Sequence, residues 1–205
     1  MYRAFKQETH MQLKAVIIVG SVRQNRLADR VLKMILATIQ NSYECDVIDP
    51  LVMPFGFVKT PIFHYDEERN GAPQWLIKAE KLIKESDAIV VITPEYNHSL
   101  SPIAASIIDH FGVDTYKCKA SAVVSYSIGK LGGIRAADQG KILLNKLGAI
   151  CVPHVLSISE ADKKISQHGV ILNKSLLISL KKLMKDLKWY TMAFKTQRER
   201  FGELN

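Results

Sequence analysis

The sequence is 205 residues long, is 47% hydrophobic and carries a formal net charge of +8. This length predicts a single domain with a sizeable core, and no apolar run approaches the roughly 20 residues that a membrane-crossing helix needs. Its three cysteines, Cys45, Cys118 and Cys151, are an odd count without the spacing of a metal site, which predicts reduced thiols in a cytoplasmic protein. The six histidines are scattered outside any HExxH pattern, so we expect no metal.

Residues 1–12 lack the apolar core of a secretory signal and are expected to form an N-terminal extension. One domain is then expected over residues 13–205. Short runs rich in branched residues predict five strands, at 13–19, 43–48, 88–92, 120–126 and 149–152.

Helical spacing fills most of the gaps between these strands. Apolar residues four apart begin at Leu27 and at Ile103, and further helices are expected at 75–85 and 134–147. Strands that alternate with helices predict an α/β fold with a parallel sheet and helices on both faces. Residues 50–72 read as a long loop, and long loops in compact domains are often functional.

The last part of the chain, residues 172–205, holds eight Lys/Arg and only three Asp/Glu. Its apolar residues step by three and four, which predicts an amphipathic helix that packs on the domain and exposes its lysines. A partner-binding surface is the alternative. No basic stretch is interleaved with aromatic residues, so we expect no nucleic acid partner, and no membrane partner is expected either.

Polar and glycine-rich segments follow the first, third and fourth predicted strands. In an open parallel sheet, ligands bind beyond the carboxyl ends of the strands, so these segments should be read together. After the first strand, "GSVRQNR" places Ser21 at a helix N-terminus, where unpaired N–H groups favour an anion. Arg23 and Arg26 add charge that suits a phosphate. A serine N-cap followed by solvated arginines is the alternative.

After the third strand, "TPEYN" crowds a proline, a carboxylate, a phenol ring and an amide together. Pro94 fixes the chain direction, and the amides of Glu95, Tyr96 and Asn97 could meet the polar edge of a flat heterocycle. The alternative is a turn in which Asn97 or Ser99 caps the next helix.

After the fourth strand, "SYSIGKLGGIRAA" supplies the hydroxyls of Ser125 and Ser127. Its glycines, Gly129, Gly132 and Gly133, allow positive φ and a close approach of the backbone to a ligand. A phosphate cradle beside a slot for a planar ring describes a site for flavin mononucleotide (FMN). The sequence contains neither GxGxxG nor GxxxxGK, which disfavours a Rossmann dinucleotide or nucleoside triphosphate site.

From about Leu13 to Leu156 the sequence resembles the NADPH-dependent FMN reductases, through "GSVRQNR", "TPEYNHS", "IDHFG" and the stretch that begins "SYSIGKLGG". The resemblance implies a flavodoxin-like, doubly wound, five-stranded parallel sheet of order 2-1-3-4-5. It also implies a homodimer or homotetramer. The cofactor-binding residues that it implies are Ser21, Arg23 and Arg26 at the phosphate, Pro94, Glu95, Tyr96 and Asn97 at the isoalloxazine, and Ser125, Tyr126, Ser127, Gly129, Gly132 and Gly133 at the other edge of the ring.

The function that this resemblance implies is an FMN-dependent NAD(P)H oxidoreductase. NADPH would pass a hydride to FMN, and a quinone or similar small-molecule acceptor would then receive two electrons. No residue is assigned as a catalytic nucleophile, because such chemistry needs none. Two alternatives remain: a non-enzymatic, flavodoxin-type electron carrier, and a flavin-responsive interaction protein that uses the basic C-terminal segment.

Overall fold

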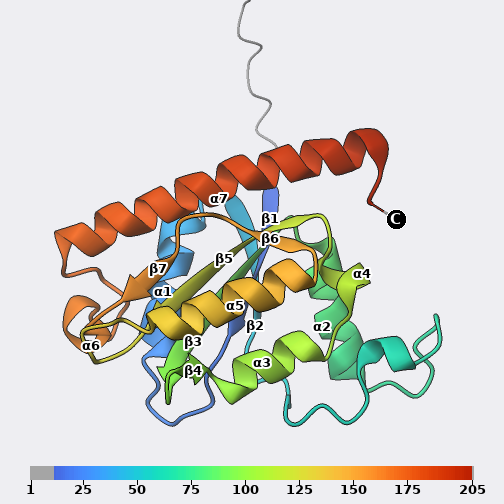
Figure 1. Ribbon diagram of the computed structural model, residues 1–205, viewed down its shortest axis with the longest axis horizontal. Helices are drawn as coiled ribbons and strands as arrows, with labels where there is room; N and C mark the ends of the chain where they lie inside the picture. Colours follow the sequence, from blue (N-terminus) through green and yellow to red (C-terminus); the bar gives the residue numbers. More distant parts are fainter. Residues whose placement is uncertain (1–11, 205) are drawn as a thin grey trace, which may run out of the picture.

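The computed structural model describes residues 12–204, so all but the last residue of the expected extension, 1–12, lies outside the described residues. A central sheet is covered by helices on both faces (Figure 1). The strands are β1 (Leu13–Val19), β2 (Tyr43–Ile48), β3 (Ala88–Tyr96), β4 (Ser99–Leu100), β5 (Lys119–Tyr126), β6 (Ala149–Cys151) and β7 (Leu156–Ile158). The helices are α1 (Ala28–Ile39), η1 (Ile62–His64), α2 (Gln74–Glu85), α3 (Pro102–Asp109), α4 (Val113–Tyr116), α5 (Ile134–Lys146), α6 (Ala161–Lys164) and α7 (Lys174–Phe201).

The main path through the sheet runs β2-β1-β3-β5-β6, and every pair along it is parallel. Counting these five strands in chain order gives 2-1-3-4-5, the flavodoxin-like order, so the predicted fold class is confirmed. The number of strands differs from the prediction, because β4 and β7 bring the sheet to seven. Both extra strands are only two or three residues long, too short to show a period in the sequence.

The edge of the sheet beyond β5 is built in two pieces. β6 pairs with the start of β5, and β7 pairs with its end, through Val124↔Leu156 to Tyr126↔Ile158. Pro153 lies between the two pieces and has no N–H to donate to β5, which explains why the strand is interrupted there.

Alternate residues of the central strands enter two separate cores. Ile17 points into a core shared with α1 and α7, whereas Val16 and Ile18 point into a core shared with α2, α3 and α5. All three side chains are fully buried. Strands covered on both faces carry continuous apolar runs, which is why the sequence signal for them is strong.

Helix α7 is 28 residues long and crosses the outside of the domain (Figure 1). Leu180, Leu183 and Leu187 are fully buried beneath it, as the amphipathic spacing predicts. Its lysines up to Lys188 are exposed, whereas Lys195 is partly buried. None of the helices within residues 12–204 combines the length and the apolar character that crossing a bilayer requires.

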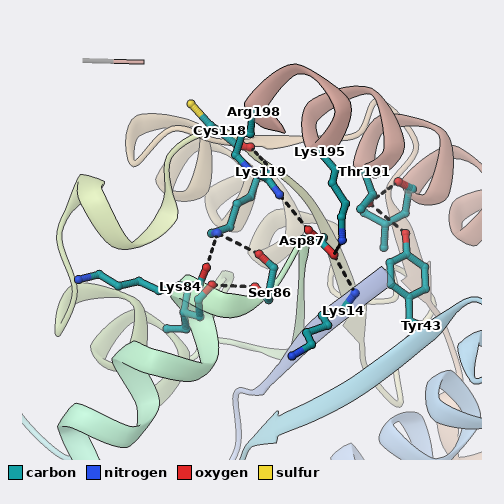
Figure 2. Close-up of polar contacts among 12 residues, drawn as sticks. Lys14, Tyr43, Lys84, Ser86, Asp87, Cys118, Lys119, Thr191, Lys195 and Arg198 are labelled. Atoms are coloured by element: carbon teal, nitrogen blue, oxygen red, sulfur yellow. Dashed lines mark hydrogen bonds and ion pairs between the residues drawn. The ribbon is translucent and has the colours of Figure 1, made fainter. Parts of the chain in front are cut away.

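A buried carboxylate fastens the C-terminal half of α7 to the amino ends of the strands (Figure 2). Asp87, just before β3, accepts hydrogen bonds from the Lys14 backbone (3.0 Å), Lys195 Nζ (2.9 Å) and Arg198 Nη2 (2.9 Å). Arg198 also donates to the carbonyl of Cys118. One acid therefore holds a strand and two turns of a helix together.

Lys119, the first residue of β5, lies beside this anchor (Figure 2). Its ammonium donates to the carbonyls of Lys84 and Ser86, both at 2.9 Å, and the residue is only 4% exposed. Burial, with a further contribution from the charge of Arg198, lowers the pKa of Lys119 to about 8. Hydrogen bonds to neutral carbonyls replace only part of the hydration that a buried ammonium loses.

Candidate functional site

The first strand ends in a loop that is packed tightly against α3. Gly20 donates its N–H to the carbonyl of Ile92 at 2.7 Å. A Cβ at Gly20 would lie 2.7 Å from Ala104 Cβ, so only glycine fits there without a shift. The loop then turns toward the carboxyl end of β3, which places Ser21 and Arg23 at the edge of the sheet where a ligand was expected.

Arg26 does not present its charge freely to this edge. It is 8% exposed and donates to both carboxylate oxygens of Asp49, to Asp29 and to the carbonyl of Ser21. Burial acts to raise the pKa of Asp49, but the hydrogen bonds and charge of Arg26 outweigh it and hold that pKa below its ordinary value. The guanidinium is thus neutralised by two acids and holds the loop in shape.

The remaining loop supplies unpaired backbone donors. Among the described hydrogen bonds, none is donated by the backbone N–H groups of residues 24–27. Asn25 has φ of 53°, a conformation that asparagine tolerates, and α1 begins with no side-chain cap. Successive N–H groups around such a residue, next to an uncapped helix start, form a concavity suited to an anion.

The segment "TPEYN" forms part of a tight hairpin rather than a free loop. β3 runs on to Tyr96 and pairs with β4 through Glu95↔Leu100 and Tyr96↔Ser99. The two-residue turn is Asn97–His98, both at positive φ. The expectation that Asn97 or Ser99 caps the next helix is wrong, because Ser101 is the N-cap of α3 and accepts from Ala104 N at 3.2 Å.

The first loop and the hairpin touch through three side chains. Ser21 Oγ lies 3.2 Å from Tyr96 Oη, and the guanidinium carbon of Arg23 lies 3.7 Å from the centre of the Tyr96 ring. Cations over aromatic rings attract at this distance. No carboxylate within residues 12–204 forms an ion pair with Arg23, so its charge remains uncompensated.

Glu95 connects the hairpin to the loop between β5 and α5, residues 127–133, which we call the third loop. Its carboxylate accepts from the backbone N–H groups of Arg135 (3.0 Å) and Ala136 (3.4 Å) in the first turn of α5, and from Arg135 Nη1 at 3.4 Å. Glu95 therefore acts as the missing cap of α5, whose own N-cap, Gly133, has no side chain.

The glycines of the third loop differ from one another. Gly133 has φ of 82°, and a Cβ there would lie 3.2–3.3 Å from Ser125, Tyr126 and Glu95. Gly132 is also at positive φ and packs on the backbone of residues 157–159. Gly129 has no positive φ, and a Cβ there would meet only Ser127 Oγ at 3.7 Å. The expectation of positive φ is therefore confirmed at 132 and 133 and is wrong at 129.

These three segments enclose a cavity of about 270 Å³, which we call the cofactor cavity. Eight of the thirteen predicted residues line it: Ser21, Arg23, Arg26, Pro94, Glu95, Tyr96, Tyr126 and Ser127. The other five do not: Asn97, Ser125, Gly129, Gly132 and Gly133. Asn97 lies in the exposed hairpin turn, and the buried Ser125 donates to the carbonyl of Gly132 (3.0 Å) behind the third loop.

Gln24, Asn25, Leu27 and Ile128 also line the cofactor cavity and were missed. They lie inside or beside the quoted motifs, so the same three segments line the cavity, but through more residue types than the prediction named. Loop residues that contribute backbone or apolar surface carry no chemical signature in a sequence.

The shifted pKa values of Tyr126 in the cofactor cavity and of two cysteines on the strands disfavour nucleophilic attack. Burial raises the pKa of Tyr126 far above its ordinary value, so its phenol stays protonated. Burial also raises the pKa of Cys45 to about 11 and that of Cys151 in the same direction, which disfavours a reactive thiolate. No group of three His, Cys, Asp or Glu side chains in the described part of the chain could hold a metal ion.

Comparisons with known proteins show the family of this chain. Residues 13–163 match the sequence profile of the family described as NADPH-dependent FMN reductase. A quinone reductase of Pseudomonas putida (strain KT2440) is 27% identical over 124 residues, which cover 58% of this chain and 63% of that protein. An NADPH azoreductase of Bacillus sp. (strain OY1-2) is 23% identical over 190 residues, or 93% of this chain and 99% of that one.

One solved structure shares the fold along most of its length. It is FerB, a flavoenzyme NAD(P)H:(acceptor) oxidoreductase from Paracoccus denitrificans, with a TM-score of 0.72 and 20% sequence identity. The superposition covers 89% of this chain and 98% of FerB.

Proposed function

Because this chain belongs to the NADPH-dependent FMN reductase family, we propose that it binds FMN in the cofactor cavity and uses NADPH to reduce a small acceptor such as a quinone. The observation that carries the proposal is the contact between the first loop and the hairpin, through Ser21, Arg23 and Tyr96. This contact brings an anion cradle and an aromatic wall to a single cavity. The quinone is proposed by analogy with the reductase of P. putida.

The donor set of the first loop fits a phosphate. The unpaired N–H groups of residues 24–27 and the uncapped start of α1 would hold its oxygens, and Arg23 would supply the compensating charge. We assign Arg26 a positioning role instead, because four of its five N–H bonds already serve Asp49, Asp29 and Ser21. This assignment removes Arg26 from the expected phosphate ligands and keeps Ser21 and Arg23.

The walls of the cavity fit the rest of the cofactor. Pro94, Tyr96 and Ile128 offer apolar and aromatic surface, while Tyr126 and Ser127 offer hydroxyls. Ser125, Gly132 and Gly133 would act indirectly. Ser125 donates to the carbonyl of Gly132, and Gly133 allows the third loop to pack closely against Glu95, which accepts from the start of α5. Asn97 and Gly129 remain predicted contacts that would require the loops to move.

When bound, FMN would supply the two-electron chemistry, taking a hydride from NADPH and passing the electrons to the acceptor. The balanced reaction is NADPH + H⁺ + quinone → NADP⁺ + hydroquinone. The chain's own residues would bind and orient the reactants and keep water from the cavity. A protonated Tyr126 would donate a hydrogen bond and would not compete as a base. A homodimer or homotetramer remains our proposed assembly.

The test is a flavin titration of the purified chain. We expect added FMN to bind with a change in its absorption spectrum, and NADPH to bleach the bound flavin without a second protein under anaerobic conditions. A subsequent quinone addition should restore the colour. Binding without bleaching would favour an electron carrier, and the absence of any spectral change would refute the proposal.

A further inference from the structure

A second cavity, of about 390 Å³, adjoins the cofactor cavity. We call it the aromatic cleft. Its walls come from the first loop, the long loop, the end of β3 and the start of α3. The apolar and aromatic residues that line it are Val22, Phe55, Phe57, Tyr96, Pro102 and Ile103.

The floor of the aromatic cleft is fixed by packing and by a hydrogen bond. Phe55 is 7% exposed and meets the rings of Trp75 and His110 edge-on, with centroids 4.7 Å and 5.1 Å away. Ser106 Oγ on α3 donates to the carbonyl of Gly56, which ties the long loop to the helix. This part of the long loop is thus held in place as a wall.

The rim of the aromatic cleft is apolar and faces water. Phe57 is 95% exposed and Val22 is 47% exposed, and both line the cleft. Apolar surface gathered around a hollow marks a binding site more often than the same residues scattered singly. A flat apolar ligand would cover both side chains.

The charge of the aromatic cleft has one sign. Arg23 is the only charged residue among its lining residues, and no carboxylate lines it. Arg23 and Tyr96 also line the cofactor cavity, so a ligand in the cleft would lie beside a bound cofactor. A third cavity, of about 460 Å³ next to Trp75 and Lys59, touches neither Arg23 nor Tyr96.

We propose that the aromatic cleft is the acceptor site and that it takes a fused aromatic ring with an anionic substituent. The proposal rests on the proposed function. The ring would lie against Phe57 and Ile103, and the anionic group would meet Arg23, whose five side-chain N–H groups leave donors for the FMN phosphate as well. Strongly hydrated inorganic oxyanions are disfavoured, because apolar walls cannot replace their hydration.

The test uses naphthalene-2-sulfonate, an aromatic anion that accepts no electrons, and 2-naphthol as the neutral comparison at pH 7. Calorimetric titrations are made on the full chain with and without saturating FMN. The variants are Phe57→Ala and Arg23→Gln. Phe201→Ala is the matched control, since Phe201 is also an exposed phenylalanine, at 75%, and is absent from the cleft.

We expect the sulfonate to bind alongside FMN. Phe57→Ala should weaken it about tenfold, through the lost apolar contact, while Phe201→Ala leaves it unchanged. Arg23→Gln should weaken the sulfonate about tenfold and 2-naphthol less than twofold.

The proposal is overturned by any of three results: no binding to the unmodified chain, displacement of the sulfonate by FMN, or equal effects of Phe57→Ala and Phe201→Ala. An equal loss of both naphthalenes in Arg23→Gln would overturn the charge selectivity. Because the sulfonate titration needs no FMN, a chain that binds the sulfonate but not FMN would refute the proposed function alone.

Discussion

The guanidinium of Arg23 rests on the ring of Tyr96, with 3.7 Å between the guanidinium carbon and the ring centre. This contact closes the first loop onto the hairpin and places one uncompensated positive charge between the cofactor cavity and the aromatic cleft. The neighbouring Arg26 carries the same formal charge, but its ion pairs with Asp49 and Asp29 neutralise it. The two arginines of "GSVRQNR" are therefore expected to respond differently to substitution.

Arg23→Gln should weaken FMN binding by about 10- to 100-fold, the range expected for loss of a charge-assisted hydrogen bond to a phosphate. Quenching of flavin fluorescence measures the dissociation constant. Lys130→Gln is the matched control, because Lys130 is an exposed cation of the third loop that does not line the cofactor cavity. Equal dissociation constants for both variants would contradict a phosphate role for Arg23.

Arg26→Gln should lower the free energy of unfolding by about 3 kcal/mol, because it leaves Asp49 without its buried partner. Urea unfolding measures the loss, and Arg26→Gln combined with Asp49→Asn should recover part of it. The pKa of Asp49 is lowered in the folded chain, so the pair stabilises the protein above the ordinary value of 3.8. The difference between the unmodified chain and Arg26→Gln should shrink as the pH falls below that value. A constant difference down to pH 2 would contradict the ion pair.

Gly133→Ala should destabilise the chain by about 1–3 kcal/mol, since alanine is strained at a φ of 82° and its Cβ would press on Ser125 and Glu95. FMN affinity should fall as well, because the third loop and the hairpin are joined there. Gly129→Ala is the control within the same loop and should change the free energy of unfolding by less than about 0.5 kcal/mol. Thermal unfolding measures the loss of stability in Gly133→Ala and in Gly129→Ala. Equal losses of stability in the two variants would contradict the close packing around Gly133.

Lys119 should give the protein an alkaline stability gain. Its folded pKa of about 8 lies below the ordinary 10.5, so between these values the unfolded chain binds more protons and unfolding becomes harder as the pH rises. Relative to Lys119→Met, the unmodified chain should gain up to about 1.4 kcal/mol per pH unit within that window. Urea unfolding at pH 7, 8, 9 and 10 measures the difference. Lys188→Met, at an exposed lysine of α7, should show no such slope.

The strands and helices could be predicted because the sheet is buried on both faces. Continuous apolar runs such as 15–19 are typical of strands covered on both faces, and α7 shows the full period of an amphipathic helix. The hairpin strand β4 has only two residues and is held by pairing with Glu95 and Tyr96. A contact of that kind leaves no periodic trace in the sequence.

The site could be predicted at the level of loops but not of individual side chains. Arg23 and Arg26 look equivalent in "GSVRQNR", and they differ only because Asp49, 23 residues further on, folds back against one of them. The aromatic cleft could not be foreseen from "PFGF", since the course of the long loop depends on its contact with Ser106. Tertiary partners, rather than residue types, decide which polar groups remain available.

Helices α1, α3 and α5 all start at the crevice edge of the sheet, and side chains of the protein already cap two of them, with Ser101 at α3 and Glu95 at α5. Glu95 fills the amino end of α5 with a carboxylate of its own, whereas the amino end of α1 keeps its donors unused. An elongated ligand with a single acidic end consequently has only one favourable orientation, with that end at the start of α1. The orientation of a bound ligand is therefore set in advance, because the carboxylate of Glu95 already occupies the amino end of α5.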